Sequence, residues 1–250
     1  TFASVGAFNL ATNSRDAAIL ATNLAPGAYT ATVSGVGTAA GVGLVEVYDV
    51  TGTARLMNLS TRALVGTGSG IIISGLVIAP GSGRRQILVR AAGPALTGFG
   101  VAGALADPEI EIVNNASPNV RIAANDNWGS GQATNSLFKS LGAFELSLGS
   151  LDSAFASLAP GLPVGGYTVQ VAGKGSSSGT VIAEIYDAAG SARTATTPRL
   201  VNLSTRAQLD TAGELVVGFV LRGLSARTVL VRAVGPSLGA LGVEGVMPDP

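Results

Sequence analysis

The sequence predicts an all-β protein made of two tandem antiparallel β-sandwich modules related by internal duplication. The segment Asn58–Ala63 recurs unchanged as Asn202–Ala207, and the motifs around it recur in the same order. Short apolar runs are separated by Gly, Pro and Asn turn residues at intervals of about 8 to 12 residues, a spacing typical of sandwiches. No long stretch has the periodicity of an amphipathic helix.

The first strands of one copy are expected to have equivalents in the other copy. A short strand is expected over Phe2–Leu10, with Phe138–Leu146 as its counterpart in the second copy. After a Pro-Gly turn, alternating apolar residues predict strands over Tyr29–Val33 and Leu44–Asp49, joined by a glycine-rich hairpin connection. The one place where a helical turn or two competes is Ser150–Leu158, which an Ala-Pro-Gly sequence stops quickly.

The middle of each copy is rich in β-branched residues. The continuous apolar runs Ile71–Ile78 and Leu215–Leu221 have strand length, which favours strands covered on both faces over helices. Gln86–Ala92 is a further strand that ends at Gly-Pro, since proline cannot donate to a ladder. Strict alternation predicts a hairpin over Glu109–Ala124, with its turn at Asn114–Pro118.

The modules are expected to span residues 1–130 and 137–250, joined by a linker at Gly129–Asn135. The second copy stops at Asp249-Pro250, which aligns with Asp107-Pro108, so the second module is expected to lack the final hairpin. An unpaired edge beside an apolar core invites strand addition from another chain. The N-terminal strand Thr1–Leu10, or an exposed strand of the first module of a neighbouring subunit, is the expected donor. The alternative is that the chain belongs to a longer repeat array whose next residues supply the hairpin in cis.

The composition excludes several classes of function. With 15 basic and 15 acidic residues the formal net charge is zero, which gives no electrostatic reason to bind nucleic acid or anionic lipid. Cysteine and histidine are absent, so disulfides, thiolate chemistry, the usual zinc sites and histidine acid–base catalysis are excluded. No apolar run approaches the ~18 residues of a membrane helix. We expect no cofactor, no nucleic-acid partner and no membrane insertion.

Charged residues that recur in both copies are the candidate site residues. They are Glu46, Glu184, Asp49, Asp187, Arg62, Arg206, Arg90, Arg232, Asp16, Asp152, Asp107 and Asp249. One hypothesis is a catalytic carboxylate pair with an arginine, as in a glycosidase. The other is a set of ion pairs that fix strand register, because a catalytic site tends to be lost from one copy of a duplicated module.

We therefore predict no catalytic residue and assign structural roles to six of these side chains. They are Glu46, Arg62, Arg90, Glu184, Arg206 and Arg232. Arg62 and Arg206 are expected to pair with a carboxylate such as Glu46 or Glu184, or with backbone carbonyls, since an unpaired arginine inside a sandwich is costly.

Four oxygen-bearing residues are candidate ligands of Ca²⁺: Asp107, Asn125, Asp126 and Asn127. An Asx turn at a strand end uses the same residue types and needs no ion. Because the dense acidic spacing of a calcium loop is missing, we predict a turn and no metal. Trp128 is expected to cap the core edge.

The order of motifs resembles a repeat of large secreted bacterial surface proteins. These motifs are Glu-x-Tyr-Asp, Asn-Leu-Ser-Thr-Arg-Ala, an apolar strand, Val-Arg-Ala-x-Gly-Pro, Ala-Asp-Pro, a hairpin and Asn-Asp-Asn-Trp. The segment Glu109–Asp187 more loosely resembles pre-peptidase C-terminal-like β-sandwich modules. The resemblance implies an extracellular or cell-surface, non-catalytic, repeat-built protein.

These observations predict a structural protein whose partners are copies of itself. The subunits are expected to form a filament or surface array head-to-tail, by β-strand complementation. The alternative is a polysaccharide- or surface-binding module of a secreted bacterial protein, with a glycan ligand. An enzyme that uses Asp and Glu is a third hypothesis.

Overall fold

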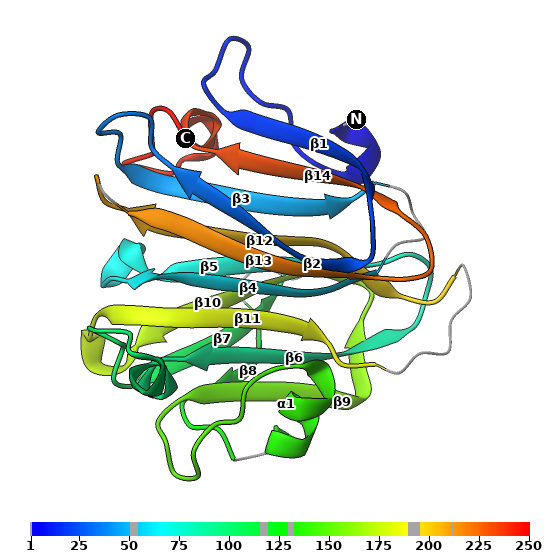
Figure 1. Ribbon diagram of the computed structural model, residues 1–250, viewed down its shortest axis with the longest axis vertical. Helices are drawn as coiled ribbons and strands as arrows, with labels where there is room; N and C mark the ends of the chain where they lie inside the picture. Colours follow the sequence, from blue (N-terminus) through cyan, green and yellow to red (C-terminus); the bar gives the residue numbers. More distant parts are fainter. Residues whose placement is uncertain (1, 51–54, 116–119, 130–132, 190–195, 212) are drawn as a thin grey trace.

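Two antiparallel sheets pack face to face in a computed structural model of the chain (Figure 1), so the predicted all-β sandwich is confirmed. The structure describes residues 2–50, 55–115, 120–129, 133–189, 196–211 and 213–250. Residues 116–119 of the predicted turn and 130–132 of the predicted linker lie outside the described residues. Within the described ranges, no helix has the length and apolar character needed to cross a membrane.

The larger sheet has eight strands in the order β1-β14-β3-β12-β5-β10-β7-β8. Their bounds are β1 Ala17–Leu24, β14 Arg227–Val234, β3 Gly41–Asp49, β12 Arg199–Leu209, β5 Ile72–Ala79, β10 Gly165–Gly173, β7 Pro108–Asn114 and β8 Val120–Asn125. The smaller sheet has six strands in the order β2-β13-β4-β11-β6-β9. Their bounds are β2 Gly27–Ser34, β13 Glu214–Arg222, β4 Arg55–Val65, β11 Gly179–Asp187, β6 Arg84–Ala92 and β9 Ser153–Pro163.

Six short helices lie outside the strands among the described residues. They are the 3₁₀ helices η1 Ala3–Val5, η2 Gly68–Gly70, η3 Pro94–Phe99, η4 Lys174–Ser176 and η5 Pro236–Leu241, and the α-helix α1 Asn135–Leu141. The helix α1 begins at a Thr134 side chain that accepts a hydrogen bond from the Leu137 N–H, and it ends at Gly142 with a φ of 81°.

The two repeats interleave instead of forming two sandwiches. In the larger sheet, β14, β12 and β10 of the second repeat alternate with β1, β3, β5 and β7 of the first. Exchanging each strand for its counterpart in the other repeat turns β1-β14-β3-β12-β5-β10 into β9-β6-β11-β4-β13-β2, which is the whole smaller sheet. The predicted division at residues 130 and 137 is therefore wrong. The chain forms one sandwich with internal two-fold pseudosymmetry.

The repeated Asn-Leu-Ser-Thr-Arg-Ala strands form the centre of this arrangement. They are β4 and β12, which lie in opposite sheets and contact each other across the core. The equivalent residues Thr61 and Thr205 are fully buried, and the Thr61 Oγ1 donates to the Thr205 Oγ1 at 3.1 Å. Because equivalent atoms meet on a symmetry axis, this pair marks the pseudo-two-fold axis. Leu59 and Ala63, two residues to either side of Thr61, also face the core.

Two element predictions were wrong. Phe2–Leu10 forms no strand but the short helix η1 and an extended tail, and Phe138–Leu146 contains most of α1. Both segments lie over the outer faces of the sheets, where their aromatic rings contact a buried arginine. Ser150–Leu158, the segment where a helical turn competes in the sequence, runs into β9 because its residues pair with β6. The N-terminal segment is therefore folded onto its own chain and is not a free donor strand.

The predicted hairpin is present as β7 and β8, and it breaks the pseudosymmetry. β7 adds to β10 at one edge of the larger sheet. The counterpart of β10 is β2, which pairs with β13 on one side and has no described strand on its other side. The Asn125 carbonyl of β8 accepts a hydrogen bond from the Ser153 hydroxyl of β9. We call the end formed by β7, β8 and β9 the closed end and the end formed by β1 and β2 the open end.

Candidate functional site

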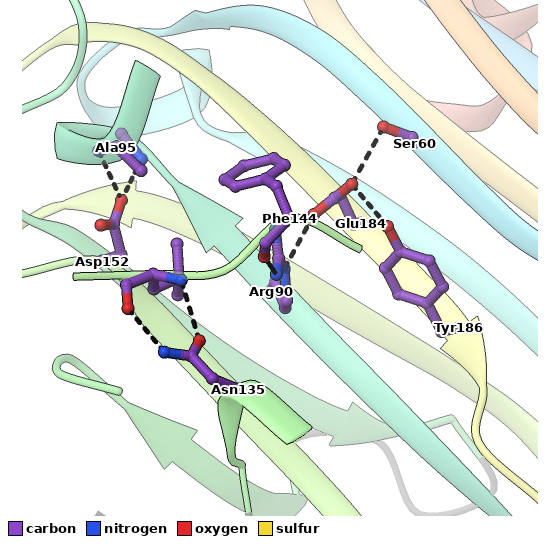
Figure 2. A network of polar contacts seen from close by, with 10 residues as sticks. Ser60, Arg90, Ala95, Asn135, Phe144, Asp152, Glu184 and Tyr186 are labelled. Carbon is purple, nitrogen blue, oxygen red and sulfur yellow. Dashed lines mark hydrogen bonds and ion pairs between the residues drawn. The ribbon is translucent and has the colours of Figure 1, made fainter. Parts of the chain in front are cut away.

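A buried arginine on β6 is the centre of the first polar cluster (Figure 2). The Arg90 Nε donates to the Glu184 Oε2 at 2.8 Å, and its Nη1 donates to the Phe144 carbonyl at 2.6 Å. The Tyr186 hydroxyl donates to the other carboxylate oxygen of Glu184 at 2.7 Å. The guanidinium lies 4.6 and 4.4 Å from the ring centroids of Phe138 and Phe144. The cluster fastens the α1 segment to the outer face of the smaller sheet.

The second repeat's arginine forms the same cluster on the larger sheet. The Arg232 Nη2 lies 2.8 Å from the Glu46 Oε2, and the Tyr48 hydroxyl donates to the Glu46 Oε1 at 2.7 Å. The Arg232 Nη1 donates to the Phe8 carbonyl at 2.5 Å, and the guanidinium lies between the rings of Phe2 and Phe8. Four of the six predicted structural residues thus lie in two equivalent clusters.

The other two predicted residues, Arg62 and Arg206, lie elsewhere. Cross-strand register places Ser60 opposite Glu184, and Arg62 opposite Ile182. Arg62 is exposed and Arg206 is half-buried, and neither forms an ion pair with a carboxylate among the described residues. The predicted pairing of Arg62 and Arg206 with Glu46 or Glu184 is wrong, because Arg232 and Arg90 hold those carboxylates.

Neither cluster offers a solvent-exposed carboxylate to a substrate, because Glu46 and Glu184 are buried. Burial raises the pKa of Glu46 more than the Tyr48 hydrogen bond and the Arg232 charge lower it. Burial and the neighbouring carboxylate also raise the pKa values of Tyr48 and Tyr186. A glycosidase site needs two carboxylates on either side of a bound sugar. Each cluster has one carboxylate, and it is enclosed by protein.

Two equivalent aspartates hold the loops that follow β6 and β14. The Asp152 Oδ1 accepts hydrogen bonds from the backbone N–H groups of Gly93 and Ala95 at 2.8 and 3.2 Å. The carboxylate of Asp16 accepts in the same way from Gly235 and Ser237. Burial raises the pKa of Asp16. Hydrogen bonds from the Ser14 and Ser237 side chains and from the backbone together lower it by more than burial raises it, so the pKa lies below its usual value.

The four residues weighed for calcium lie at the closed end. The Lys174 Nζ is 2.7 Å from the Asp126 Oδ2 and 4.0 Å from the Asp107 Oδ2, so an ammonium group occupies the position between these carboxylates. The Asn125 Oδ1 accepts from the Ala154 N–H, and its Nδ2 donates to the Asn127 carbonyl. Within the described ranges, no group of three or more acidic side chains is placed to hold a metal ion.

Trp128 lies at the same end as these residues. It is 9% exposed, and its ring packs 5.6 Å from that of Phe138, which places it over the second hydrophobic cluster. Its indole N–H donates to the Ser147 carbonyl at 3.0 Å. The ring is therefore turned towards protein, as expected for a cap over the core edge.

Equivalent residues of the open and closed ends differ in their exposure to solvent. On β10, Tyr167, Val169 and Val171 are at most 1% exposed because β7 covers them. Their counterparts on β2 are Tyr29 and Ala31, both half-buried, and Val33. On β1, Ile19 is 65% exposed and Leu20 is 48% exposed. Ile19 lies on the same groove as Tyr29, Ala31 and Val33, whereas Leu20 points to the other face of the sheet.

A groove of about 460 Å³ runs between β1 and β2 at this end. It is lined mainly by apolar side chains, among them Ile19, Tyr29, Ala31, Val33 and Phe219. The Tyr29 and Phe219 rings stack at 5.5 Å and form its floor. The sequence predicted an open edge but assigned it to the second module. The interleaved topology places it on β2, in the first repeat, and the β1 wall was not predicted at all.

No family model and no curated protein matches the chain. Among solved structures, it is weakly similar to the VP2 subviral particle of infectious bursal disease virus, with 10% identity and a TM-score of 0.16. Structures of the Gx and Gt strains of that virus give 11% and 9% identity and TM-scores of 0.15 and 0.12. The alignments cover 94 to 95% of this chain but less than half of each viral chain. Similarity this weak carries no inference about function.

Proposed function

We propose that the chain is a non-catalytic structural protein, a subunit of an extracellular filament or surface array. Its copies associate head-to-tail by β-strand complementation. The observation that carries the proposal is the open edge of β2, whose counterpart β10 is covered by β7. Edge strands present unpaired N–H and C=O groups, so another chain gains a full ladder of hydrogen bonds by adding to them.

The two ends of the sandwich are unlike, which supports a head-to-tail contact. The open end has β1 and β2 at its edges, and the closed end has β8 and β9 (Figure 1). A contact between unlike ends repeats from subunit to subunit and gives a filament, unless the rotation closes a ring. Zero net charge and two lysines in 250 residues leave little repulsion between copies.

The extracellular part of the proposal rests on the resemblance to repeats of secreted bacterial surface proteins. The buried clusters support the non-catalytic part, because the carboxylates of Glu46 and Glu184 are buried and paired with Arg232 and Arg90. The recurring charges of these clusters form ion pairs within the chain and are therefore not available to a substrate.

Sedimentation velocity over a concentration series, with electron microscopy of the same samples, tests this function. We expect species that grow with concentration and images of ordered linear or array-like assemblies. Particles that stay at 24.7 kDa at every concentration would contradict the proposal. If such monomers bound an insoluble polysaccharide, the binding-module alternative would replace it.

A further inference from the structure

A groove on the outer face of the larger sheet has Arg206 in its lining, and we call it the Arg206 groove. Along β12 the preceding residue, Thr205, is buried in the core, so Arg206 lies on the opposite, outer face. The side chain is half-buried, and among the described residues it forms no hydrogen bond and no ion pair. A guanidinium that is partly removed from water and has no partner favours the approach of an anion.

The floor of the Arg206 groove is hollow because its central residue is a glycine. Gly75 of β5 pairs with Thr168 of β10 on one side and with Ser204 of β12 on the other. A Cβ added at Gly75 would lie 2.5 Å from the Ser204 Oγ, so a larger side chain would fill the space between these strands. The cavity over this floor has a volume of about 380 Å³. Ligand sites commonly have volumes of roughly 300–1,000 Å³.

The walls of this cavity are largely aliphatic. Apolar side chains on its outer side come from β3, β5, η5 and the turn after η5: Leu44, Ile73, Val77, Leu238, Leu241 and Val243. Leu241 is 60% exposed, so a hydrocarbon chain that lies against it removes apolar surface from water. The one aromatic residue in the lining, Tyr167, is 1% exposed and offers no face on which a sugar ring could stack.

A second cavity continues the groove on the far side of Arg206. Its volume is about 620 Å³, and it shares Arg206, Leu241 and Val243 with the first cavity. Its lining includes Gln208 and Glu244, which are both exposed. Because the Glu244 carboxylate repels a further negative charge on this side, the groove favours a ligand with one anionic group over a polyanion such as an acidic polysaccharide.

We infer that the Arg206 groove binds an aliphatic monocarboxylate, such as a short fatty acid. The ligand's carboxylate accepts hydrogen bonds from the Arg206 guanidinium, and its hydrocarbon chain lies over Gly75 against the apolar side chains of η5. The site is built from β3, β5, β12 and η5, so binding does not depend on association between copies.

Calorimetric titration with octanoate tests the role of the arginine. Arg206→Met should weaken octanoate binding by roughly ten- to a hundredfold, because it removes charge-assisted hydrogen bonds and keeps a side chain of similar length. Arg62 is the equivalent residue on β4 of the smaller sheet, and it is exposed. Arg62→Met is therefore the matched control and should bind octanoate like the parent. Loss of binding in Arg62→Met with full binding in Arg206→Met would overturn the assignment.

A second pair of variants tests the floor without changing a charge. Gly75→Ala should weaken octanoate binding, because the added methyl group occupies the hollow beside Ser204. Gly218 of β13 pairs with Ser60 as Gly75 pairs with Ser204, so Gly218→Ala makes the same change on the other sheet. It should leave binding unchanged, and equal effects of the two variants would contradict the location of the site. Unchanged melting temperatures show that the variants are folded.

The chemical class of the ligand is tested on the parent protein, which needs no variant to fold. Octanol lacks the carboxylate and acetate lacks the chain, so both should bind more weakly than octanoate. Octanoate that carries a diazirine at its chain end should crosslink to Leu238, Leu241 or Val243. Octanol binding as tightly as octanoate, glucuronate binding more tightly, or crosslinks confined to the groove between β1 and β2 would each overturn the inference, as would a parent that binds no octanoate.

Discussion

At the scale of single residues, two buried arginines lie beneath pairs of aromatic rings. Arg90 and Arg232 are fully buried, and each holds one glutamate and one backbone carbonyl from a covering segment. The ion pair joins adjacent strands and the carbonyl joins a segment outside the sheet. Each arginine therefore connects the sheet to the layer above it.

Replacing Arg90 by Met should lower the free energy of unfolding by about 3–5 kcal/mol, because Glu184 then stays buried without its cation. Urea unfolding measures the loss. The double variant Arg90→Met/Glu184→Leu should lose less than the sum of the two single variants, since the partners are coupled. A single variant as stable as the parent would contradict the role assigned to the cluster.

The lowered pKa of Asp16 predicts a dependence of stability on acid. Its pKa in the folded chain lies below the usual value of 3.8, so its contribution is full above that pH and is lost as the pH falls through the folded pKa. Asp16→Asn should be less stable than the parent at pH 7, and the difference should shrink below pH 3.8. Urea unfolding at several pH values tests this, and a difference that grows in acid would contradict it.

The charged residues could be found from sequence, but their partners could not. Recurrence in both repeats identified Glu46, Glu184, Arg90 and Arg232. The partner of a strand residue depends on register, which sequence alone leaves open. Shifting the pairing by two residues would have placed Arg62 beside Glu184, so the error is one of register and not of residue choice.

At the scale of elements, the loops after β6 and β14 pass very close to neighbouring backbone. A Cβ added at Gly93 would lie 2.1 Å from the Leu105 carbonyl oxygen, and one at Gly235 would lie 2.1 Å from that of Met247. Side chains cannot be accommodated at such distances without movement of the backbone. These loops can therefore be built only with glycine at both positions.

Gly93→Ala should lower the free energy of unfolding by about 1–3 kcal/mol or more, because the backbone around Leu105 must shift. Gly98 in η3 is the matched control, since an added Cβ meets nothing within 4 Å there. Gly98→Ala should change stability by less than about 1 kcal/mol. Thermal unfolding distinguishes the two, and equal melting temperatures would contradict the close approach.

Strands with strict alternation were predictable, whereas the covering segments were not. The alternation of Glu109–Val113 predicts one buried and one more accessible face, and in β7 the two faces are buried and half-buried. Phe2–Leu10 has the apolar content of a strand, but its rings are used to cover Arg232. A local sequence pattern cannot reveal a contact between Phe8 and Arg232, which lie 224 positions apart. For this reason the sequence predicted a strand over Phe2–Leu10.

At the scale of the whole molecule, the duplication was visible in the sequence and the interleaving was not. Repeat length suggested two cores, and each repeat has enough strands for a small sandwich. Some equivalent strands, such as β4 and β12, have nearly the same sequence, so their local pattern does not distinguish a neighbour from one copy from a neighbour from the other. The choice is made by long-range packing, such as the contact between Thr61 and Thr205 at the pseudo-two-fold axis.

Interleaving predicts that neither repeat folds alone. Residues 1–130 and 137–250, produced as separate chains, should each lack a cooperative unfolding transition, because most strand neighbours belong to the other repeat. An equimolar mixture should recover one transition and a 1:1 complex. A monomeric 1–130 fragment that unfolds cooperatively would show that the repeats are independent modules after all.

The central claim is that copies associate through the outer edge of β2, and residue-resolved hydrogen exchange tests it most directly. As concentration rises and assemblies form, the amides of Thr30, Thr32 and Ser34 should become protected. Those of Tyr29, Ala31 and Val33, which point towards β13, should be protected at every concentration. Assembly that leaves Thr30, Thr32 and Ser34 exchanging as fast as in the monomer would contradict the account.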